Sequence, residues 1–372
     1  MAATTRIRRV GAPLRGLAIG LRTQSWPAHS RLFVAGDGNA WAIADDAAEV
    51  AGIAAGLGVR VGPERWIARV RNQSVFHTSQ FTLIGLPFEK NGNRLGVAYL
   101  HGRPGTPGMP DFDTCYETVR RRHEELDRVQ VSNRAMEELV LGTGIAPEKV
   151  FRIPIGVDTR RFGLRDAASR REARREFGLP ESAFVVGSFQ KDGVGWGEGL
   201  EPKLIKGPDV LLDVAGRLAR EVSGLRVLLT GPARGYVAAG LERLGIPFEQ
   251  VRLPDLDAVS RAYCAIDLCL VTSRDEGGPK AVLESMATGV PLVTTRVGQA
   301  ADLVRDGANG WLREVEDAEG LAAAAAYVAG APLAELERVA ESARETAFAN
   351  SWEALRPRWR ELLAGFVAME RA

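Results

Sequence analysis

The sequence SRDEGGPKAVLESMATGVPLVTT, residues 273–295, lies between two apolar runs of strand character. These runs span residues 266–271 and 290–293, so the sequence between them predicts a loop that leads into a short helix. The loop, residues 276–279, contains two glycines, which allow a ligand to approach the backbone closely. We therefore expect a ligand site where the first strand ends and the helix begins.

The helix is expected to begin at Pro279 and to end at Gly289. Proline suits the first helical position because its missing N–H removes no intrahelical bond, and glycine is common just beyond a helix end. The first turn offers unpaired N–H groups and the positive end of a helix dipole to polar or anionic ligand atoms. A plainer alternative is a surface loop with a solvated pair between Lys280 and Glu284, four residues apart.

As a whole, the string Glu-Gly-x-x-x-x-x-Leu-Glu-Ser-Met-Ala-x-Gly-x-Pro-Leu-Val resembles the signature of the retaining glycosyltransferases of family 4, the type with Glu-x7-Glu. That family has the GT-B fold, in which two doubly wound Rossmann-like domains face each other across a cleft. The resemblance is good over about residues 95–160 and 183–315 and weak over the first 70. It implies transfer of a sugar from a nucleoside-diphosphate sugar.

The resemblance also implies roles for the quoted stretch. Glu276 would contact the sugar or support the reacting centre as a catalytic residue, and Glu284 would accept a hydrogen bond from the ribose. The backbone of Gly277, Gly278 and Pro279 would line the sugar hydroxyls. The donor-binding residues expected in this stretch are Gly277, Gly278, Pro279, Lys280, Val282 and Glu284.

The composition is ordinary for a protein with two cores. The chain has 372 residues, 45% of them hydrophobic, and domains of about 150 residues are typical. Its 48 basic and 47 acidic residues leave a net charge of +1, so no overall field indicates nucleic acid or a membrane as a partner. The three cysteines have no ligand spacing and suggest a reducing compartment. An arginine-rich N-terminal stretch predicts at most a weak contact with a membrane surface.

Two successive alternations of strands and helices predict an α/β fold with two doubly wound parallel sheets. We expect an acceptor-side domain over residues 1–158 and a nucleotide-sugar domain over residues 159–350. By resemblance, the last helix, within residues 351–372, would cross back onto the first domain. Among the expected elements are strands at residues 74–83 and 251–253 and a final helix at residues 351–366.

The first half offers a few candidate residues at predicted strand ends, where ligands bind in open parallel sheets. His101, followed by Gly102 and Arg103, resembles the family's histidine near the transferred sugar. The surrounding glycines and prolines suggest an exposed loop tip, although a lone histidine is more often structural. Gly36 and Gly38 follow the first strand, and we place them with Arg103 on the acceptor side.

The second half offers cations for a diphosphate. Lys206 opens a helix beside the end of the strand that contains Ser188, so its ammonium could reach a phosphate held there. The resembled family usually has arginine where this chain has Ser188. Lys191 or Lys203, in the long loop between them, could supply the missing charge. The donor-binding residues expected here are Ser188, Lys191 and Lys206.

Two Asp-x-Asp patterns, at residues 111–113 and 255–257, invite a metal interpretation, because paired carboxylates can hold a divalent ion beside phosphates. Such short patterns arise easily by chance, and the resembled family uses cationic side chains and helix N-termini instead of metal. We therefore expect no metal site, and no cofactor other than the donor, a UDP- or GDP-sugar.

Together these features predict a hexosyltransferase-type enzyme, cytoplasmic or membrane-peripheral, that acts without metal and retains the anomeric configuration. Its partners would be a nucleotide-sugar donor and a sugar, lipid or small-molecule acceptor, but no nucleic acid, and the protein would be a monomer or a homodimer. A sugar-nucleotide epimerase or a phosphorylase on the same fold is an alternative enzyme. A catalytically silent partner in glycan assembly is the alternative without activity, which the absence of arginine at position 188 keeps open.

Overall fold

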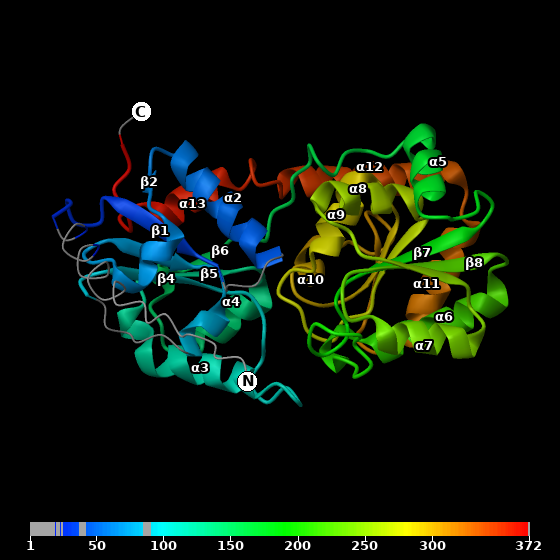
Figure 1. Cartoon of the computed structure of the whole chain (residues 1–372), viewed down its shortest axis with the longest axis horizontal. Helices are drawn as coiled ribbons and strands as arrows, with labels where there is room; N and C mark the ends of the chain where they lie inside the picture. Colours follow the sequence, from blue (N-terminus) through cyan, green and yellow to red (C-terminus); the bar gives the residue numbers. More distant parts are fainter. Residues whose placement is uncertain (1–18, 20–22, 24, 37–41, 85–90, 371–372) are drawn as a thin grey trace, which may run out of the picture.

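The structure is a computed structural model that describes residues 19, 23, 25–36, 42–84 and 91–370. It contains two six-stranded sheets, and every pairing between neighbouring strands is parallel. Figure 1 shows them as two lobes side by side, which we call the first and second domains. The predicted α/β fold with two parallel sheets is therefore confirmed. Gly38 and the arginine-rich N-terminal stretch lie outside the described residues.

The first sheet has the strand order β2-β1-β3-β4-β5-β6. Both of its faces are covered by helices, so its strands are apolar on both sides. Its elements are β1 (Arg31–Ala35), α2 (Ala42–Gly56), β2 (Arg60–Val61), η1 (Glu64–Arg69), β3 (Ser74–His77), η2 (Gln80–Ile84), β4 (Arg94–Tyr99), α3 (Pro110–Arg122), η3 (His123–Glu125), β5 (Arg128–Val131), α4 (Arg134–Leu141), η4 (Pro147–Lys149) and β6 (Val150–Arg152).

The second sheet has the order β12-β11-β10-β7-β8-β9. One buried cluster joins it to α5, α8, α9 and α12, and another joins it to α6, α7 and α11 on the opposite face. Its elements are α5 (Ala167–Glu176), β7 (Phe184–Phe189), η5 (Leu204–Lys206), α6 (Pro208–Glu221), β8 (Leu225–Thr230), α7 (Gly235–Leu244), β9 (Phe248–Val251), α8 (Leu256–Ala265), β10 (Leu268–Val271), α9 (Lys280–Thr288), β11 (Leu292–Thr295), α10 (Ala300–Leu303), β12 (Trp311–Arg313), α11 (Ala318–Gly330) and α12 (Leu333–Ala349).

The last helix packs against the first sheet, far from its neighbours in sequence. This helix is α13 (Arg356–Leu363), and Figure 1 places it beside α2. Trp359 is fully buried there and meets the ring of Phe76 edge to face, with ring centres 5.6 Å apart. The Ser74 hydroxyl also donates to the carbonyl of Phe366 at 2.5 Å. The final segment of the chain thus completes the core of the first domain. The exact domain boundaries remain a prediction.

Several predicted elements differ in extent from those observed. The strand expected to continue to residue 83 ends at His77, because its partner β1 ends at Ala35, whose carbonyl accepts from both the N–H and the hydroxyl of Thr78. The chain then forms η2. The strand expected at residues 251–253 lies three residues earlier, as β9. The final helix is shorter than expected, because the residues after Ser351 form turns.

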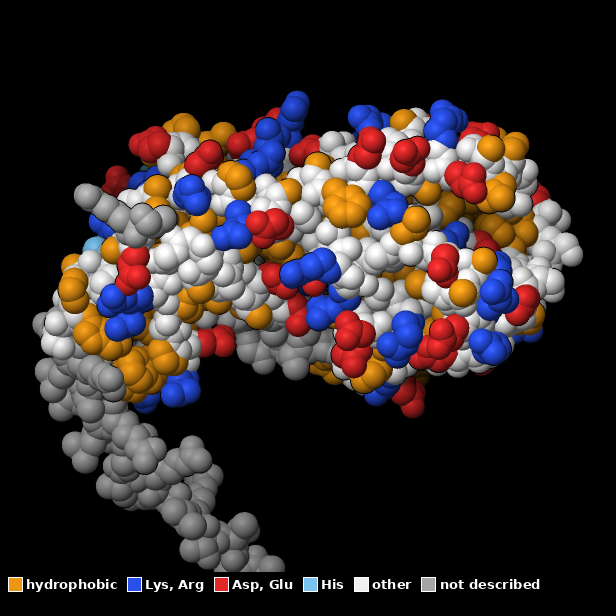
Figure 2. Space-filling model, turned by 90° about the horizontal axis from the view of Figure 1, so that it is seen from above, with side chains coloured by type: hydrophobic (Ala, Val, Ile, Leu, Met, Phe, Trp, Pro, Cys, Tyr) orange, Lys and Arg blue, Asp and Glu red, His pale blue; other side chains and the backbone are white. Residues whose placement is uncertain are grey.

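Charged side chains of both signs are mixed over the face shown in Figure 2, without a continuous patch of one sign. This distribution fits the near-zero net charge. Among the helices that the structure describes, none is long and apolar enough to cross a membrane.

Candidate active site

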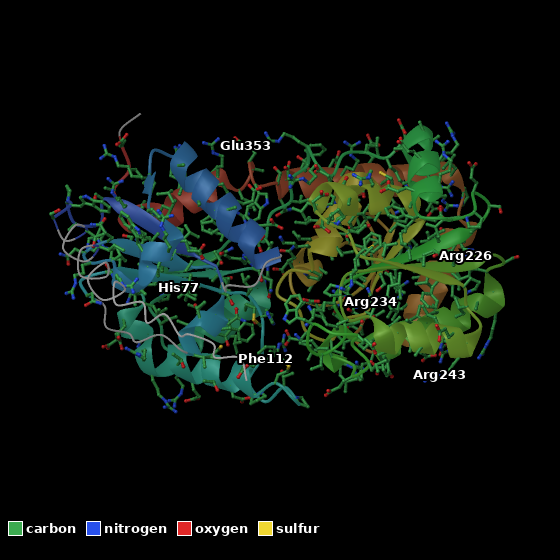
Figure 3. The ribbon with its side chains drawn as sticks, viewed as in Figure 1. His77, Phe112, Arg226, Arg234, Arg243 and Glu353 are labelled. Carbon is green, nitrogen blue, oxygen red and sulfur yellow. The ribbon has the colours of Figure 1, made fainter. Side chains whose placement is uncertain are left out.

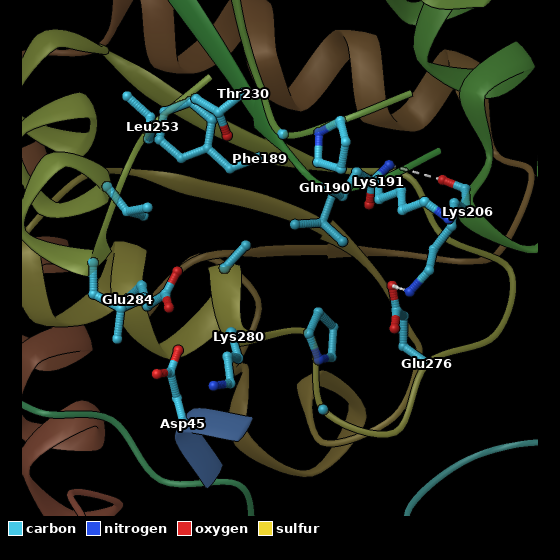
Figure 4. A pocket seen from close by; sticks show the side chains of 18 of the residues that line it. Asp45, Phe189, Gln190, Lys191, Lys206, Thr230, Leu253, Glu276, Lys280 and Glu284 are labelled. Atoms are coloured by element: carbon cyan, nitrogen blue, oxygen red, sulfur yellow. Dashed lines mark hydrogen bonds and ion pairs between the residues drawn. The ribbon is translucent and has the colours of Figure 1, made fainter. Parts of the chain in front are cut away.

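A pocket of about 880 Å³ opens at the carboxyl ends of β7, β8 and β10, beside the start of α9. Figure 4 shows its wall, which includes Asp45 from α2 of the first domain. Carboxyl ends of parallel strands are the expected ligand-binding edge of such a sheet. Seven of the predicted residues line this pocket: Lys191, Lys206, Gly278, Pro279, Lys280, Glu276 and Glu284.

One side of the pocket holds a close ion pair. Lys206 Nζ lies 2.5 Å from Glu276 Oε1, and the Ser273 hydroxyl donates to the same oxygen at 3.0 Å. Burial disfavours the charged carboxylate, but Lys206 outweighs this effect, so the pKa of Glu276 is lowered. Glu276 is therefore held ionised inside the pocket.

Glu284 lies farther along the pocket, on the first turns of α9. Its side chain is buried, and its Oε2 accepts a hydrogen bond of 2.9 Å from the Tyr263 hydroxyl. Burial raises its pKa, and the positive charge of Lys280 opposes that shift. Lys280, however, forms its ion pair across the cleft, with Nζ 2.8 Å from Asp46 Oδ1 of α2. The alternative of a solvated surface pair between Lys280 and Glu284 is therefore wrong.

Gly277 lies at the contact between the two domains rather than on the pocket wall. Its carbonyl accepts from the Ser132 hydroxyl at 2.7 Å, from the Asn133 side-chain amide at 3.0 Å and from the Gln299 N–H at 3.0 Å. A Cβ at this position would lie 2.4 Å from the carbonyl oxygen of Leu100. Glycine is thus required by the close approach of the first domain, and the carbonyl is already occupied.

Three lysines face the pocket from the loop between β7 and α6. Lys191 and Lys203 join Lys206 there, and Lys191 Nζ lies 4.6 Å from the ring centre of Trp196. Burial and then the charge of Lys206 lower the pKa of both Lys191 and Lys203. The three ammonium groups are therefore close enough to repel each other, and a phosphate anion between them would relieve that repulsion.

Ser188 does not reach the pocket, contrary to prediction. It is fully buried, and its hydroxyl accepts a 2.9 Å hydrogen bond from Arg234 Nη2. Arg234 Nη1 also donates to the carbonyls of Ser188, Gln190 and Thr230, and its Nε lies 3.0 Å from the buried carboxylate of Asp192. The arginine lies in the second domain on the side toward the first (Figure 3).

Arg234 thus fixes the loop that carries Lys191. This role was not predicted, because nothing in the sequence after β8 distinguishes this arginine from a solvated one. The only signal is its position four residues beyond Thr230, at the carboxyl end of a strand.

The Val282 side chain is fully buried in the core beneath α9 and does not line the pocket. On the acceptor side, the Gly36 N–H donates to Glu64 Oε1 at 2.8 Å, and Arg103 is exposed. Neither lines the pocket.

His101 is more enclosed than the predicted loop tip. Its side chain is 25% exposed and packs edge to face on the rings of Phe81 and Phe112, with ring centres 5.6 and 5.3 Å away. Its Nδ1 lies 3.9 Å from Asp275 Oδ1 of the second domain. Burial, followed by the charge of Lys206, lowers the pKa of His101 to about 4. His101 is therefore a neutral side chain beside the Glu276 end of the site.

Both Asp-x-Asp patterns have structural roles. Asp113 accepts from the Gly105 N–H, Asp255 caps α8 by accepting from the Ala258 N–H, and Asp257 pairs with Arg161 at 2.7 Å. Within the described residues no group of three or more His, Cys, Asp or Glu side chains is placed to hold a metal ion.

Solved structures with this architecture include GT-B proteins. The structure of Anabaena Alr3699/HepE in complex with UDP-glucose superposes with a TM-score of 0.72, covering 90% of this chain and 99% of that one at 17% identity. Sucrose-phosphate synthase from Thermosynechococcus elongatus gives a TM-score of 0.64 at 20% identity, over 78% and 74% of the two chains. These likenesses place the fold in the GT-B class.

Sequence comparison identifies the family. A family model described as "Glycosyl transferases group 1" matches residues 198–330. The D-inositol 3-phosphate glycosyltransferase of Thermomonospora curvata is 30% identical over 303 residues, which are 73% of this chain and 67% of that protein. The Geodermatophilus obscurus enzyme of the same name is 34% identical over 250 residues, 62% of this chain and 50% of its own. The chain belongs to the group 1 glycosyltransferases. It spans about half the length of the first curated relatives.

Proposed function

We propose that this protein transfers a sugar from a nucleoside-diphosphate sugar to an acceptor hydroxyl with retention of the anomeric configuration, without a metal ion, as a family 4 enzyme of the Glu-x7-Glu type. The observation that carries the proposal is the arrangement of charges along one pocket. Three lysines line the pocket on the side that holds Glu276, and Glu284 lines it farther along. A sugar diphosphate with its ribose has the complementary order of groups.

Each part of a donor has a matching part of the pocket. The diphosphate would lie among Lys191, Lys203 and Lys206, where N–H donors are charged and the anion gains most from them. Phe189 and Leu253 supply apolar wall for the base. The sugar would lie at the other end of the diphosphate, beside Glu276, Gly278 and Pro279. His101, neutral at physiological pH, would approach the sugar from the first domain.

The chemistry then needs no protein nucleophile. The bond between the anomeric carbon and the diphosphate oxygen breaks while the acceptor oxygen bonds to that carbon on the same face of the sugar. The acceptor proton passes to an oxygen of the departing diphosphate. Lys206 would exchange its contact with Glu276 for a phosphate oxygen and stabilise the charge that develops there. Glu276, released from the lysine, would accept a hydrogen bond from a sugar hydroxyl.

The relatives suggest which acceptor to test first. Several curated relatives are named D-inositol 3-phosphate glycosyltransferases, so inositol 3-phosphate is the first candidate for this chain. Simple sugars and lipid-linked sugars form the next set. UDP is the first nucleotide to test, because the HepE structures contain UDP-glucose, or UDP with glucose.

A thermal-shift screen with UDP, GDP, ADP and their sugars tests the proposal. A ligand present at a hundred times its dissociation constant adds about 2.7 kcal/mol to the free energy of unfolding, which is a clear rise in Tm. We expect one nucleotide and its sugar to stabilise the protein without added metal. The stabilising sugar nucleotide is then incubated alone and with acceptors: released nucleoside diphosphate supports transfer, whereas an altered sugar that remains on the nucleotide indicates an epimerase. A protein that binds no nucleotide would contradict the proposal.

A further inference from the structure

Helix α2 of the first domain brings two consecutive carboxylates to the donor pocket. Asp46 forms the 2.8 Å ion pair with Lys280 across the cleft, and Asp45 lines the pocket itself. Figure 4 shows the carboxylates of Asp45 and Glu284 facing each other, both on the same side of Lys280. The nucleoside end of the pocket is thus bounded by acidic groups from both domains.

The charges at this end do not balance. Three carboxylates, those of Asp45, Asp46 and Glu284, adjoin the single ammonium of Lys280, and that ammonium is engaged by Asp46. Arg161 also lines the pocket, but its Nε donates to Asp257 at 2.7 Å. Tyr263 supplies one donor, to Glu284 Oε2.

Acceptor oxygens therefore remain on two neighbouring carboxylates, one from each domain. No hydrogen bond or ion pair of the Asp45 side chain is found within the described part of the chain, and the second oxygen of Glu284 likewise has no donor there. Glu284 is 8% exposed, so its unused oxygen is available to a ligand in the pocket rather than to bulk water.

Carboxylate oxygens without hydrogen-bond donors favour a ligand that carries hydroxyl groups, because hydroxyls can donate to them. Buried carboxylates repel phosphate, and their lone pairs need donors that water can supply only poorly in a narrow site. Two neighbouring hydroxyls on one ring, as in the ribose of the donor, match two neighbouring carboxylates, one from each domain. A ribose that lacked one hydroxyl would leave a carboxylate without a donor.

We propose that Asp45 is a ribose-recognition residue contributed by the first domain, which accepts a hydrogen bond from one of the two ribose hydroxyls while Glu284 accepts from the other. This inference rests on the proposed function, since it requires a nucleotide donor in this pocket. It assigns Asp46 a positioning role: by engaging Lys280 it prevents that ammonium from neutralising the two acceptors. Donor binding would then join the two domains directly through the ribose.

The test compares a nucleoside diphosphate with its 2′-deoxy and 3′-deoxy analogues by calorimetry, using the wild-type chain, Asp45→Ala, Glu284→Ala and Asp213→Ala. Asp213 pairs with Arg217 on the exposed face of α6 and serves as the matched control. We expect the wild type and the control to prefer the full ribose by about tenfold or more over each analogue, as for a hydrogen bond to a charged group. Asp45→Ala should lose that preference for one analogue, and Glu284→Ala for the other.

The outcomes separate the inference from the proposed function. If Asp45→Ala keeps both preferences, or changes the affinity for all three nucleotides equally, Asp45 acts at most through its charge and the inference is wrong. If Glu284→Ala alone removes both preferences, both hydroxyls belong to Glu284. If the wild type binds none of the three nucleotides, nor any with another base, the proposed function itself fails.

Discussion

Lys206 Nζ and Glu276 Oε1 lie 2.5 Å apart on one side of the donor pocket, although the two residues are 70 positions apart in sequence. The lysine comes from the end of η5 and the glutamate from the loop before α9. Their pairing compensates the two opposite charges. A diphosphate would compete with Glu276 for the lysine, so the pair couples donor binding to release of the carboxylate.

Replacement of Glu276 should affect turnover more than donor binding. In Glu276→Gln, Lys206 keeps its positive charge for the diphosphate, but the sugar loses a charged acceptor near the reacting carbon. We expect kcat to fall by about 10²-fold or more, with nucleotide affinity unchanged or improved. Steady-state kinetics with saturating donor measure this, and wild-type turnover in Glu276→Gln would refute the assigned role.

Lys191 and Lys203 should replace the arginine that the resembled family has at position 188. Lys191→Ala and Lys203→Ala should each weaken binding of the nucleoside diphosphate by about ten- to a hundredfold, because each removes a charge-assisted contact. Binding of the uncharged nucleoside should change little. Calorimetry with both ligands checks this, with the exposed Arg217→Ala as the control. Equal losses for the diphosphate and the nucleoside would instead indicate damage to the pocket.

Arg234 should be needed for stability rather than for contact with the donor. Arg234→Met leaves the fully buried carboxylate of Asp192 without its partner, and breaking one side of a buried ion pair costs about 3 to 5 kcal/mol. The surface variant Arg217→Ala should cost at most about 1 kcal/mol. Urea denaturation measures both. The double variant Arg234→Met with Asp192→Leu should recover part of the loss, and a stable single variant would contradict the argument.

Two buried histidines should make stability depend on pH. Burial lowers the pKa of His77 to about 4, and His101 has a similarly lowered pKa. Between pH 4 and about 6.5 the unfolded chain binds protons that the folded chain does not, so stability rises with pH there, by up to about 1.4 kcal/mol per unit for each histidine. This contribution is complete above pH 6.5 and is lost as the pH falls through 4.

The variant His77→Gln isolates one histidine from the carboxylates that titrate in the same range. Denaturant titrations of this variant and the wild type at pH 4.5 to 7.5 should give a difference in stability that varies with pH in the stated direction. A difference that is constant over this range would show that His77 has the same pKa in the folded and unfolded chains.

The fold could be predicted well from the sequence, because the patterns that indicate strands and helices are local in sequence. The apolar runs and the glycines that interrupt them predicted the strand before residue 272 and the helix that ends at Thr288. The loop between these two elements contains Glu276 and the helix contains Glu284, so both residues could be placed from local sequence alone. Short segments such as β9 were misplaced by a few residues, since strand ends depend on the length of the partner strand.

Pairings across long sequence distances were not predictable. Nothing local indicates that Lys280 meets Asp46 of the other domain instead of Glu284, four residues away, or that Arg234 fills the space behind Ser188. Each depends on how two separately folded parts meet. The sequence indicated which residues could bind a ligand. The three-dimensional structure was needed to show which buried charges form ion pairs with each other.

The central claim is that this pocket transfers a sugar with retention. The most direct measurement uses the sugar nucleotide that stabilises the protein, labelled with ¹³C at an α-linked anomeric carbon, and follows that carbon by NMR with inositol 3-phosphate or another acceptor. The account predicts that its signal moves from the nucleotide to an α-linked product, and that Glu276→Gln slows this change. A β-linked product, or a signal that never leaves the nucleotide with any donor and acceptor, would contradict it.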